Sequence, residues 1–437
     1  MYAQPLVVTG SKINGTTYNV VYVVTQNDTL YAINATPPTG TGNTCGPVAS
    51  LPFLTTGATN GHSPADCSQI GGGGCATIAP KVGILGTPVI VFANHTATMY
   101  LVTETQTYNS GTQKYTFYHY LHSVDLPTLT ENASVQIYPP GQQSNSSFFS
   151  QEHIQRPGLL YANGYVYVAF SMMDGAGTPF PNGAVFAYNP TTLAEAGYFQ
   201  TSLGGDPNSN GGGIWQGGAG LAFGPDSATG TNYIYFTTAN GVFDADTGGT
   251  NYGDSFVKLN ASPNGSGQLT VAASFTPADQ YFRSNSTCPN GGNSPGDYDF
   301  GSGGVMLIPP HELNTPYLAA SGDKEGGIWF INLASPGGFA GSDTCSSSGG
   351  DGNTQAWPVN GTLSVSGPVI HTNPTFWENT AGTNHLYIAP TKEAHRGLAT
   401  CCNTLFVLPA NQSIRLAAPV TSPPKIKMAQ QWFSSMV

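Results

Sequence analysis

The densest group of potential metal ligands in this sequence lies in one glycine-rich loop. Asp244 and Asp246 stand two residues apart, and Asn251 and Asp254 follow closely. Carboxylate and amide oxygens are the hard ligands that Ca²⁺ prefers, so the loop is a candidate calcium site. The same residue types also favour Asx turns, in which the side-chain oxygen accepts a backbone hydrogen bond. The pattern alone leaves both interpretations open.

The cysteines predict disulfide chemistry rather than metal binding. The chain has seven of them and no Cys-x-x-Cys pair, which argues against zinc and c-type haem sites. Cys67 and Cys75 enclose four consecutive glycines, and we expect these two cysteines to bond to each other, because so flexible a segment closes easily. A bond from Cys45 to either one, or buried free thiols, are the alternatives. The other candidates are a Cys288–Cys345 pair and a bond shared by Cys401 and Cys402 or made with an outside thiol.

Glycosylation acceptors point to the same oxidising compartment. Asn-x-Ser/Thr motifs without proline occur at eleven positions. They are Asn14, Asn27, Asn34, Asn94, Asn132, Asn145, Asn260, Asn264, Asn285, Asn360 and Asn411. Together with the disulfide, they predict an extracellular, secreted glycoprotein. A chain rich in Thr, Ser and Asn also generates such motifs by composition.

The composition excludes several classes of partner. Among 437 residues there are 12 Lys and Arg against 23 Asp and Glu, a net charge of −11, and charged residues make up only 8%. Phosphate binding needs clustered cations, so nucleic acid and anionic membrane surfaces are not expected partners. No apolar stretch is long enough for a membrane span, and residues 5–8 already predict a strand rather than a signal peptide. No hydrolase triad, paired-glutamate or Walker motif stands out.

The elements that must position these residues are repeated β-strands. One strand order recurs six times: a short apolar strand opening near Gly, Pro or Ala, then a Tyr-rich and β-branched strand, then a third strand ending in a turn. The stretches 165–171, 183–190 and 194–201 illustrate the second, third and fourth strands of one unit. No sustained 3.6-residue period is present, so little helix is expected.

This repeat predicts an all-β fold, a β-propeller of at least six four-stranded blades in one domain, 1–437. A set of β-sandwiches is the alternative, but it gives no reason for a sixfold strand order. The expected blades lie at about 1–56, 84–140, 154–202, 214–278, 300–360 and 366–420, with 421–437 as a C-terminal tail.

Several segments resemble the bacterial secreted quinoprotein-like β-propellers, which carry pyrroloquinoline quinone (PQQ) repeats. The matching segments span nearly the whole chain: 2–6, 20–23, 30–33, 83–88, 155–158, 212–216, 251–256, 299–304 and 324–326. The resemblance implies the propeller fold, and a ring of seven or eight blades in the full-length protein. It is much weaker for activity, since many such propellers have no established enzymatic role.

Quinoprotein dehydrogenases of this kind use a tryptophan floor, a calcium-polarised quinone, an aspartate base and a cation at the quinone edge. By resemblance, Trp215 is the floor, Asn240 a metal ligand, Asp279 or Asp297 the base, and Lys324 the cation. The metal-binding glutamate has no clear match, Asp174 being only near the right blade, and the vicinal Cys401–Cys402 pair lies late in the chain.

Each of these residues also has an ordinary structural interpretation: a packed tryptophan, a turn asparagine and a loop ion pair. We therefore expect a non-catalytic extracellular propeller that acts as a structural or recognition module. No bound cofactor is expected, and Ca²⁺ is the alternative to that expectation. Its expected partners are attached glycans, extracellular proteins or other copies of itself, and the low charge would permit stacking into filaments. The alternatives are a PQQ- and calcium-dependent oxidoreductase acting on alcohols or sugars, and a carbohydrate-binding propeller.

Overall fold

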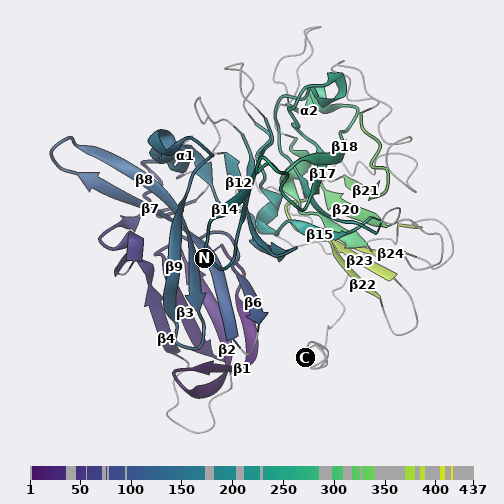
Figure 1. The fold of residues 1–437 in the computed structure, drawn as a ribbon. Helices are drawn as coiled ribbons and strands as arrows, with labels where there is room; N and C mark the ends of the chain where they lie inside the picture. The colour runs from purple at the N-terminus through teal and green to yellow at the C-terminus, as the bar shows by residue number, and fades with distance from the viewer. Residues whose placement is uncertain are drawn as a thin grey trace, which may run out of the picture.

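A computed structural model describes most of the first 340 residues and short parts of the remainder. The described residues are 2–35, 46–55, 57–70, 75, 78–93, 96–172, 182–202, 211–226, 230–284, 298–308, 317–324, 327–339, 370–378, 384–388, 404–408 and 415–416. Strands dominate them, and the sheets follow one another through the molecule in chain order (Figure 1).

The first sheet is an antiparallel meander of four neighbouring strands. Its strands are β1 (Leu6–Ile13), β2 (Thr16–Thr25), β3 (Thr29–Asn34) and β4 (Pro47–Pro52). Asn14 and Gly15, with φ of 48° and 83°, make the tight turn between β1 and β2. Both residue types tolerate positive φ, which explains why the hairpin turns here.

The second and third sheets each carry one extra short strand. The second contains β5 (Ser63–Pro64), β6 (Val89–Ala93), β7 (Thr96–Asn109), β8 (Lys114–Asp125) and β9 (Thr130–Ile137), with β5 and β6 both pairing with β7. The third contains β10 (His153–Ile154), β11 (Leu160–Ala162), β12 (Tyr165–Met172), β13 (Ala184–Tyr188) and β14 (Glu195–Gln200), with β10 and β11 both pairing with β12.

The last three sheets keep the same chain order. The fourth contains β15 (Ala222–Pro225), β16 (Asn232–Thr237), β17 (Phe256–Asn260) and β18 (Val271–Phe275). The fifth contains β19 (Met306–Ile308), β20 (Leu318–Gly322) and β21 (Ile328–Asn332). The sixth contains β22 (Thr375–Glu378), β23 (Asn384–Ile388), β24 (Thr404–Leu408) and β25 (Arg415–Leu416).

Helices are short and lie in the connections. They are α1 (Ser146–Glu152), α2 (Gln280–Ser284) and the 3₁₀ turns Phe53–Thr55, Gly57–Thr59, Gln143–Asn145, Gln216–Gly218, Ala245–Thr247 and Phe300–Ser302. Within the described part of the chain, no helix is both long and apolar enough to cross a membrane.

Consecutive sheets pack face to face, as the blades of a propeller do. On β12, Val166, Val168 and Phe170 pack toward the second sheet, whereas Tyr167 and Ala169 pack toward the fourth. Successive strand residues point to opposite faces, so burying both faces makes the strand almost continuously apolar. The other neighbouring pairs of sheets share cores of the same kind.

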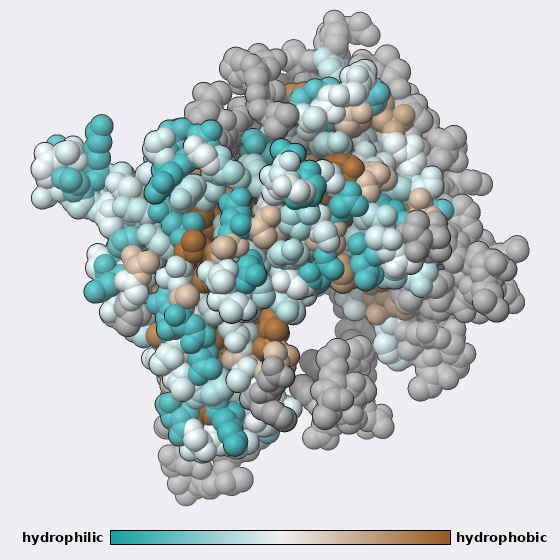
Figure 2. Space-filling model, viewed as in Figure 1, coloured by the Kyte–Doolittle hydropathy of each residue, from teal (hydrophilic) through white to brown (hydrophobic). Residues whose placement is uncertain are grey.

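The predicted all-β propeller is confirmed, with six sheets in the described residues. The fifth sheet shows three strands there, and the expected fourth, at 353–359, lies outside the described residues. Figure 2 shows a largely hydrophilic surface on one face, with hydrophobic residues in small separated patches. With charged residues at 8%, hydroxyls, amides and backbone must solvate most of that surface.

Candidate functional site

The segments that lead into the innermost strands meet around one axial pocket. Its volume is about 380 Å³, and residues from all six sheets or their connections line it. They are Tyr2, Ile78, Arg156, Trp215, Gly217, Asp299, Ser302, Lys324 and His371. A second cavity of about 450 Å³ adjoins it at Gly217 and is lined mainly by backbone and neutral polar side chains. Chemistry-bearing side chains far apart in sequence therefore converge at the propeller axis.

Trp215 forms an apolar wall of this pocket. It packs against a buried cluster that includes Ile78, Leu85 and Ile154, and it begins the turn Gln216–Gly218. Gly217 in this turn has φ of 57°, and a Cβ there would lie 1.8 Å from the carbonyl oxygen of His371. Only glycine fits so close an approach, which explains the glycines that follow the tryptophan.

Lys324 and Asp299 form an ion pair at the pocket edge. The Lys324 Nζ lies 2.5 Å from the Asp299 Oδ2, and the other oxygen of that carboxylate accepts a hydrogen bond from the Asn240 backbone N–H at 2.9 Å. Two residues predicted from the resemblance, Trp215 and Lys324, thus do line one pocket, and the third, Asn240, contacts it through Asp299. Asp299 itself was missed as a site residue, although it opens the segment 299–304 that carried the resemblance.

Arg156 is the second cation of the pocket. Its guanidinium lies over the Tyr2 ring at 5.5 Å from the centroid, and its Nη2 donates a hydrogen bond to the Gly217 carbonyl at 3.4 Å. None of the ion pairs formed by the described residues includes Arg156. Burial lowers its pKa, because a desolvated guanidinium is less stable, yet arginine stays charged in proteins. An anion in the pocket would stabilise this charge.

Asp279, one of the two predicted bases, does not line the pocket. Its Oδ1 lies 2.6 Å from the Arg283 Nε, and Arg283 Nη1 lies 3.1 Å from the Asp323 Oδ2. Asp323 also accepts a hydrogen bond from the Trp329 indole at 2.8 Å. These buried contacts make Asp279 part of an ion cluster between blades. Asp297, the other predicted base, lies outside the described residues, as do Asp174 and Cys401–Cys402.

The loop proposed for calcium is organised by hydrogen bonds within the protein. Asp244 accepts hydrogen bonds from the Asn251 backbone N–H at 2.8 Å and from its side-chain amide at 2.6 Å. Asp246 is exposed, and buried Asp254 accepts a hydrogen bond from the Phe300 backbone N–H at 3.0 Å. The structure brings Asp244 and Asn251 together, whereas Asp254 bonds a different partner. Neither contact is an Asx turn, in which the side-chain oxygen accepts from the backbone N–H two residues on.

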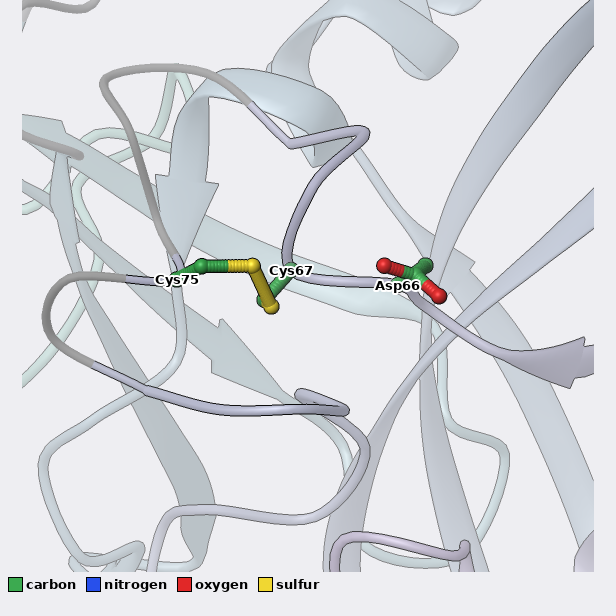
Figure 3. Close-up of side chains that lie close together, drawn as sticks. All are labelled: Asp66, Cys67 and Cys75. Atoms are coloured by element: carbon green, nitrogen blue, oxygen red, sulfur yellow. A yellow bond between two sulfur atoms is a disulfide. The ribbon is translucent and has the colours of Figure 1, made fainter.

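Cys67 and Cys75 form the predicted disulfide, with a Cα–Cα distance of 4.7 Å (Figure 3). With Asp66 they make the only group, among the described residues, of three His, Cys, Asp or Glu side chains whose donor atoms lie within 4.8 Å of one another. Since both sulfurs are used in the bridge, the group is not a metal site in this form. Cys45, Cys288, Cys345, Cys401 and Cys402 lie outside the described residues.

The glycosylation motifs divide by exposure. Asn14, Asn27, Asn132, Asn145 and Asn264 are exposed, whereas Asn34 and Asn260 are half-buried. The Asn260 side-chain amide donates to the Thr270 carbonyl and hydroxyl, at 3.1 and 2.9 Å, so its nitrogen is engaged in the fold. Asn94, Asn285, Asn360 and Asn411 lie outside the described residues. Exposure keeps the first five available to carry a glycan.

Comparison with known proteins gives no family assignment. No family model matches the chain, and no curated protein does. Among solved structures, a europium-containing methanol dehydrogenase superimposes with a TM-score of 0.45 and 13% identity, over 95% of this chain and 66% of that one. This chain therefore spans a little less than two thirds of that enzyme.

Glycosidases also superimpose, at lower scores. An exo-1,5-α-L-arabinanase from a bovine ruminal metagenomic library gives a TM-score of 0.26 and 11% identity, over 77% of this chain and 97% of that one. A β-fructofuranosidase of Bombyx mori gives 0.25 and 8%, over 96% and 62%. Superpositions at these scores carry no information on activity, so function must be argued from the pocket itself.

Proposed function

We propose that this protein is an extracellular recognition module that binds a small anionic ligand in the axial pocket of its propeller. The observation that carries this proposal is Arg156, a pocket cation that belongs to no ion pair of the described residues. Lys324, the other cation, is neutralised by Asp299 at 2.5 Å. Among the described lining residues, one positive charge is therefore left without a carboxylate partner, in a chain of net charge −11.

The shape of the lining suggests a ligand that carries both a carboxylate and an apolar face. Trp215 and Tyr2 offer aromatic rings beside the guanidinium, and Ile78 adds an aliphatic surface. Arginine matches a carboxylate with two parallel hydrogen bonds, and aromatic rings stack on flat apolar or sugar-ring faces. Aromatic carboxylates and sugar acids both fit this description. Comparing the affinities of one ligand of each class shows which class the pocket prefers.

The test is calorimetric titration of the purified protein with benzoate and glucuronate, alongside the uncharged counterparts benzyl alcohol and methyl glucoside. We expect at least one carboxylate to bind, its uncharged counterpart to bind at least about tenfold more weakly, and added salt to weaken the binding of the carboxylate. Absence of binding by both carboxylates at millimolar concentration, or equal binding of charged and uncharged probes, would contradict the proposal.

The extracellular location rests on the Cys67–Cys75 disulfide and on five exposed glycosylation motifs. Disulfides persist in oxidising compartments, and a glycan needs an exposed asparagine. Intact-mass measurement of the protein from its native source should show mass above the bare polypeptide. Stacking of copies into filaments stays a prediction of the low charge, and imaging of native particles tests it.

A PQQ-dependent oxidoreductase is the second candidate, favoured by the convergence of Trp215, Asp299 and Lys324 in one pocket. The quinone carboxylates would suit Arg156 and Lys324. Calcium fits less well, because Ca²⁺ takes six to eight oxygen ligands. Among the described lining residues, Asp299 is the single carboxylate, and its oxygens already bond Lys324 and Asn240. We therefore derive no reaction step through the metal.

Adding PQQ and Ca²⁺ to the purified protein separates the two candidates. A stoichiometric quinone absorbance band with dye reduction by alcohols or aldose sugars would establish the oxidoreductase and overturn the non-catalytic proposal. A band without turnover would instead identify PQQ as one anion that the pocket accepts.

A further inference from the structure

Two bonds, one covalent and one a hydrogen bond, join Cys67 to the chain that follows the glycine-rich loop. Cys67 is bonded covalently to Cys75, and its backbone N–H donates to the Pro80 carbonyl at 3.2 Å. Beside it, Lys81 pairs with Asp66 at 2.8 Å, and the Val82 N–H donates to the Ala65 carbonyl at 2.9 Å. Cys75 and Pro80 are therefore both bonded to Cys67, and Figure 3 shows the disulfide to Cys75.

Ile78 lies between Cys75 and Pro80 in the chain and lines the axial pocket. It is only 2% exposed and belongs to the buried cluster with Ile70, Val82 and Leu85 against which Trp215 packs. It follows Cys75 by three positions, so the chain limits it to about 11 Å from that anchor at full extension. The position of one pocket wall, and the support behind Trp215, thus depend on where Cys75 is fixed.

We propose that the Cys67–Cys75 disulfide is a positioning element of the axial pocket: it fixes Ile78 and, through the shared apolar cluster, Trp215. This inference rests on the proposed function, because it assigns the bridge a role in binding the anionic ligand. Without the bridge, the span from Cys67 to Pro80 is a single loop containing four consecutive glycines. Closing that longer, glycine-rich loop costs more conformational entropy, so Ile78 would sample more positions.

The test variant is the double substitution Cys67→Ser with Cys75→Ser, which keeps side-chain size nearly unchanged. Its matched control is Leu269→Ala, a buried residue of the core between the third and fourth sheets that does not line the pocket. Both changes destabilise the folded state. The two variants are therefore compared at a temperature at which circular dichroism shows that both are folded, so that a difference between them reflects positioning and not unfolding.

Trp215 supplies a readout that needs no ligand. The emission and acrylamide quenching of Trp215 are obtained by subtracting the signal of the same protein with Trp215→Phe. We expect red-shifted emission and stronger quenching in the double serine variant, because Trp215 loses apolar support. The Leu269→Ala protein should match the wild type.

Binding of the better of the two carboxylate probes, benzoate or glucuronate, is the second readout. We expect about tenfold weaker binding by the double serine variant and wild-type affinity for Leu269→Ala. Unchanged affinity in the double serine variant overturns the inference and leaves the proposed function standing. If the wild type binds neither probe, the proposed function fails, and unchanged Trp215 emission then overturns the positioning role as well.

Ile78→Ala, with the bridge intact, covers the case in which the serine variant does not fold. Shortening the wall residue should weaken probe binding and red-shift the emission of Trp215 in the same direction. If Ile78→Ala leaves both the affinity and the emission at wild-type values, the wall has no role in the pocket and the inference is overturned.

Discussion

Two arginines of this protein make similar aromatic contacts in opposite electrostatic surroundings. Arg283 lies 5.5 Å from the Trp329 ring centroid, is 1% exposed, and bonds two carboxylates, those of Asp279 and Asp323. Arg156 lies 5.5 Å from the Tyr2 ring centroid, but it lines a cavity and belongs to no ion pair of the described residues. The first guanidinium is neutralised within the fold, and the second is the one that we propose binds an anionic ligand.

Residue type alone therefore cannot distinguish a buried ion cluster from a binding site, because both use an arginine beside an aromatic ring. A buried charge that is paired with an opposite charge is neutralised by the fold itself. A charge that faces a cavity without such a partner is neutralised only by a ligand or by solvent.

Arg283→Met should cause the largest loss of stability. It leaves the Asp279 and Asp323 carboxylates buried without their cation, and breaking a buried ion pair in this way costs about 3–5 kcal/mol. Chemical denaturation measures the loss. Arg156→Met is the matched control and should lose less than about 1 kcal/mol, since its charge bonds no carboxylate in the fold. Equal losses for the two variants would remove the distinction.

Asp28 extends the comparison to a buried carboxylate. Its carboxylate is fully buried, neither oxygen has a hydrogen-bond partner among the described residues, and burial together with the Glu104 charge raises its pKa well above the usual value. The folded state therefore keeps a proton that the unfolded state releases, so this group lowers stability as pH rises above about 4.

Asp28→Asn removes that titration and keeps a residue type that tolerates the φ of 52° at this position. The stability of the variant relative to wild type should increase between pH 5 and pH 8, because only the wild-type folded state holds a proton that its unfolded chain releases. Thermal unfolding at the two pH values measures it. A relative stability that is independent of pH would show that Asp28 is not a buried protonated acid.

Asp299→Asn should give the smallest effect, and that effect should be a gain in affinity for the carboxylate probe. Removing the carboxylate removes the negative charge that pairs with Lys324, so the pocket becomes more positive, and affinity for the carboxylate probe should increase by about three- to tenfold. The uncharged counterpart serves as the control and should bind as it does to wild type. Weaker binding of the carboxylate would show that Asp299 contacts the ligand favourably.

The sequence predicts the repeating architecture well, because blade strands bury both faces and are therefore recognisable as Tyr- and Val-rich segments between turns. It also predicts the Cys67–Cys75 bond, since both cysteines flank a short flexible loop. Trp215 and Lys324 could be placed near each other only through the resemblance of their segments to a known family.

What the sequence could not supply is the pairing of charges across blades. Asp279 and Asp299 look alike in the sequence, but Asp279 pairs with Arg283 of α2, the helix that it immediately precedes, and Asp299 pairs with Lys324 at the pocket. Arg156 lies in segment 155–158, which carries the resemblance, but nothing in the sequence shows that the one carboxylate among the described lining residues, Asp299, pairs with Lys324 instead. Which charged side chains pair is determined by the folded propeller, because the residues that line the pocket come from distant segments of the chain.

The measurement that tests the central claim most directly is the affinity of the carboxylate probe for wild type, Arg156→Lys and Arg156→Met, determined by titration calorimetry at one ionic strength. If Arg156 binds the anion, Arg156→Met should bind about 10- to 100-fold more weakly, as expected for loss of a charged hydrogen bond, with Arg156→Lys between them and the uncharged counterpart unaffected. Equal affinities of the three proteins for the carboxylate would contradict the claim that the axial pocket is an anion site.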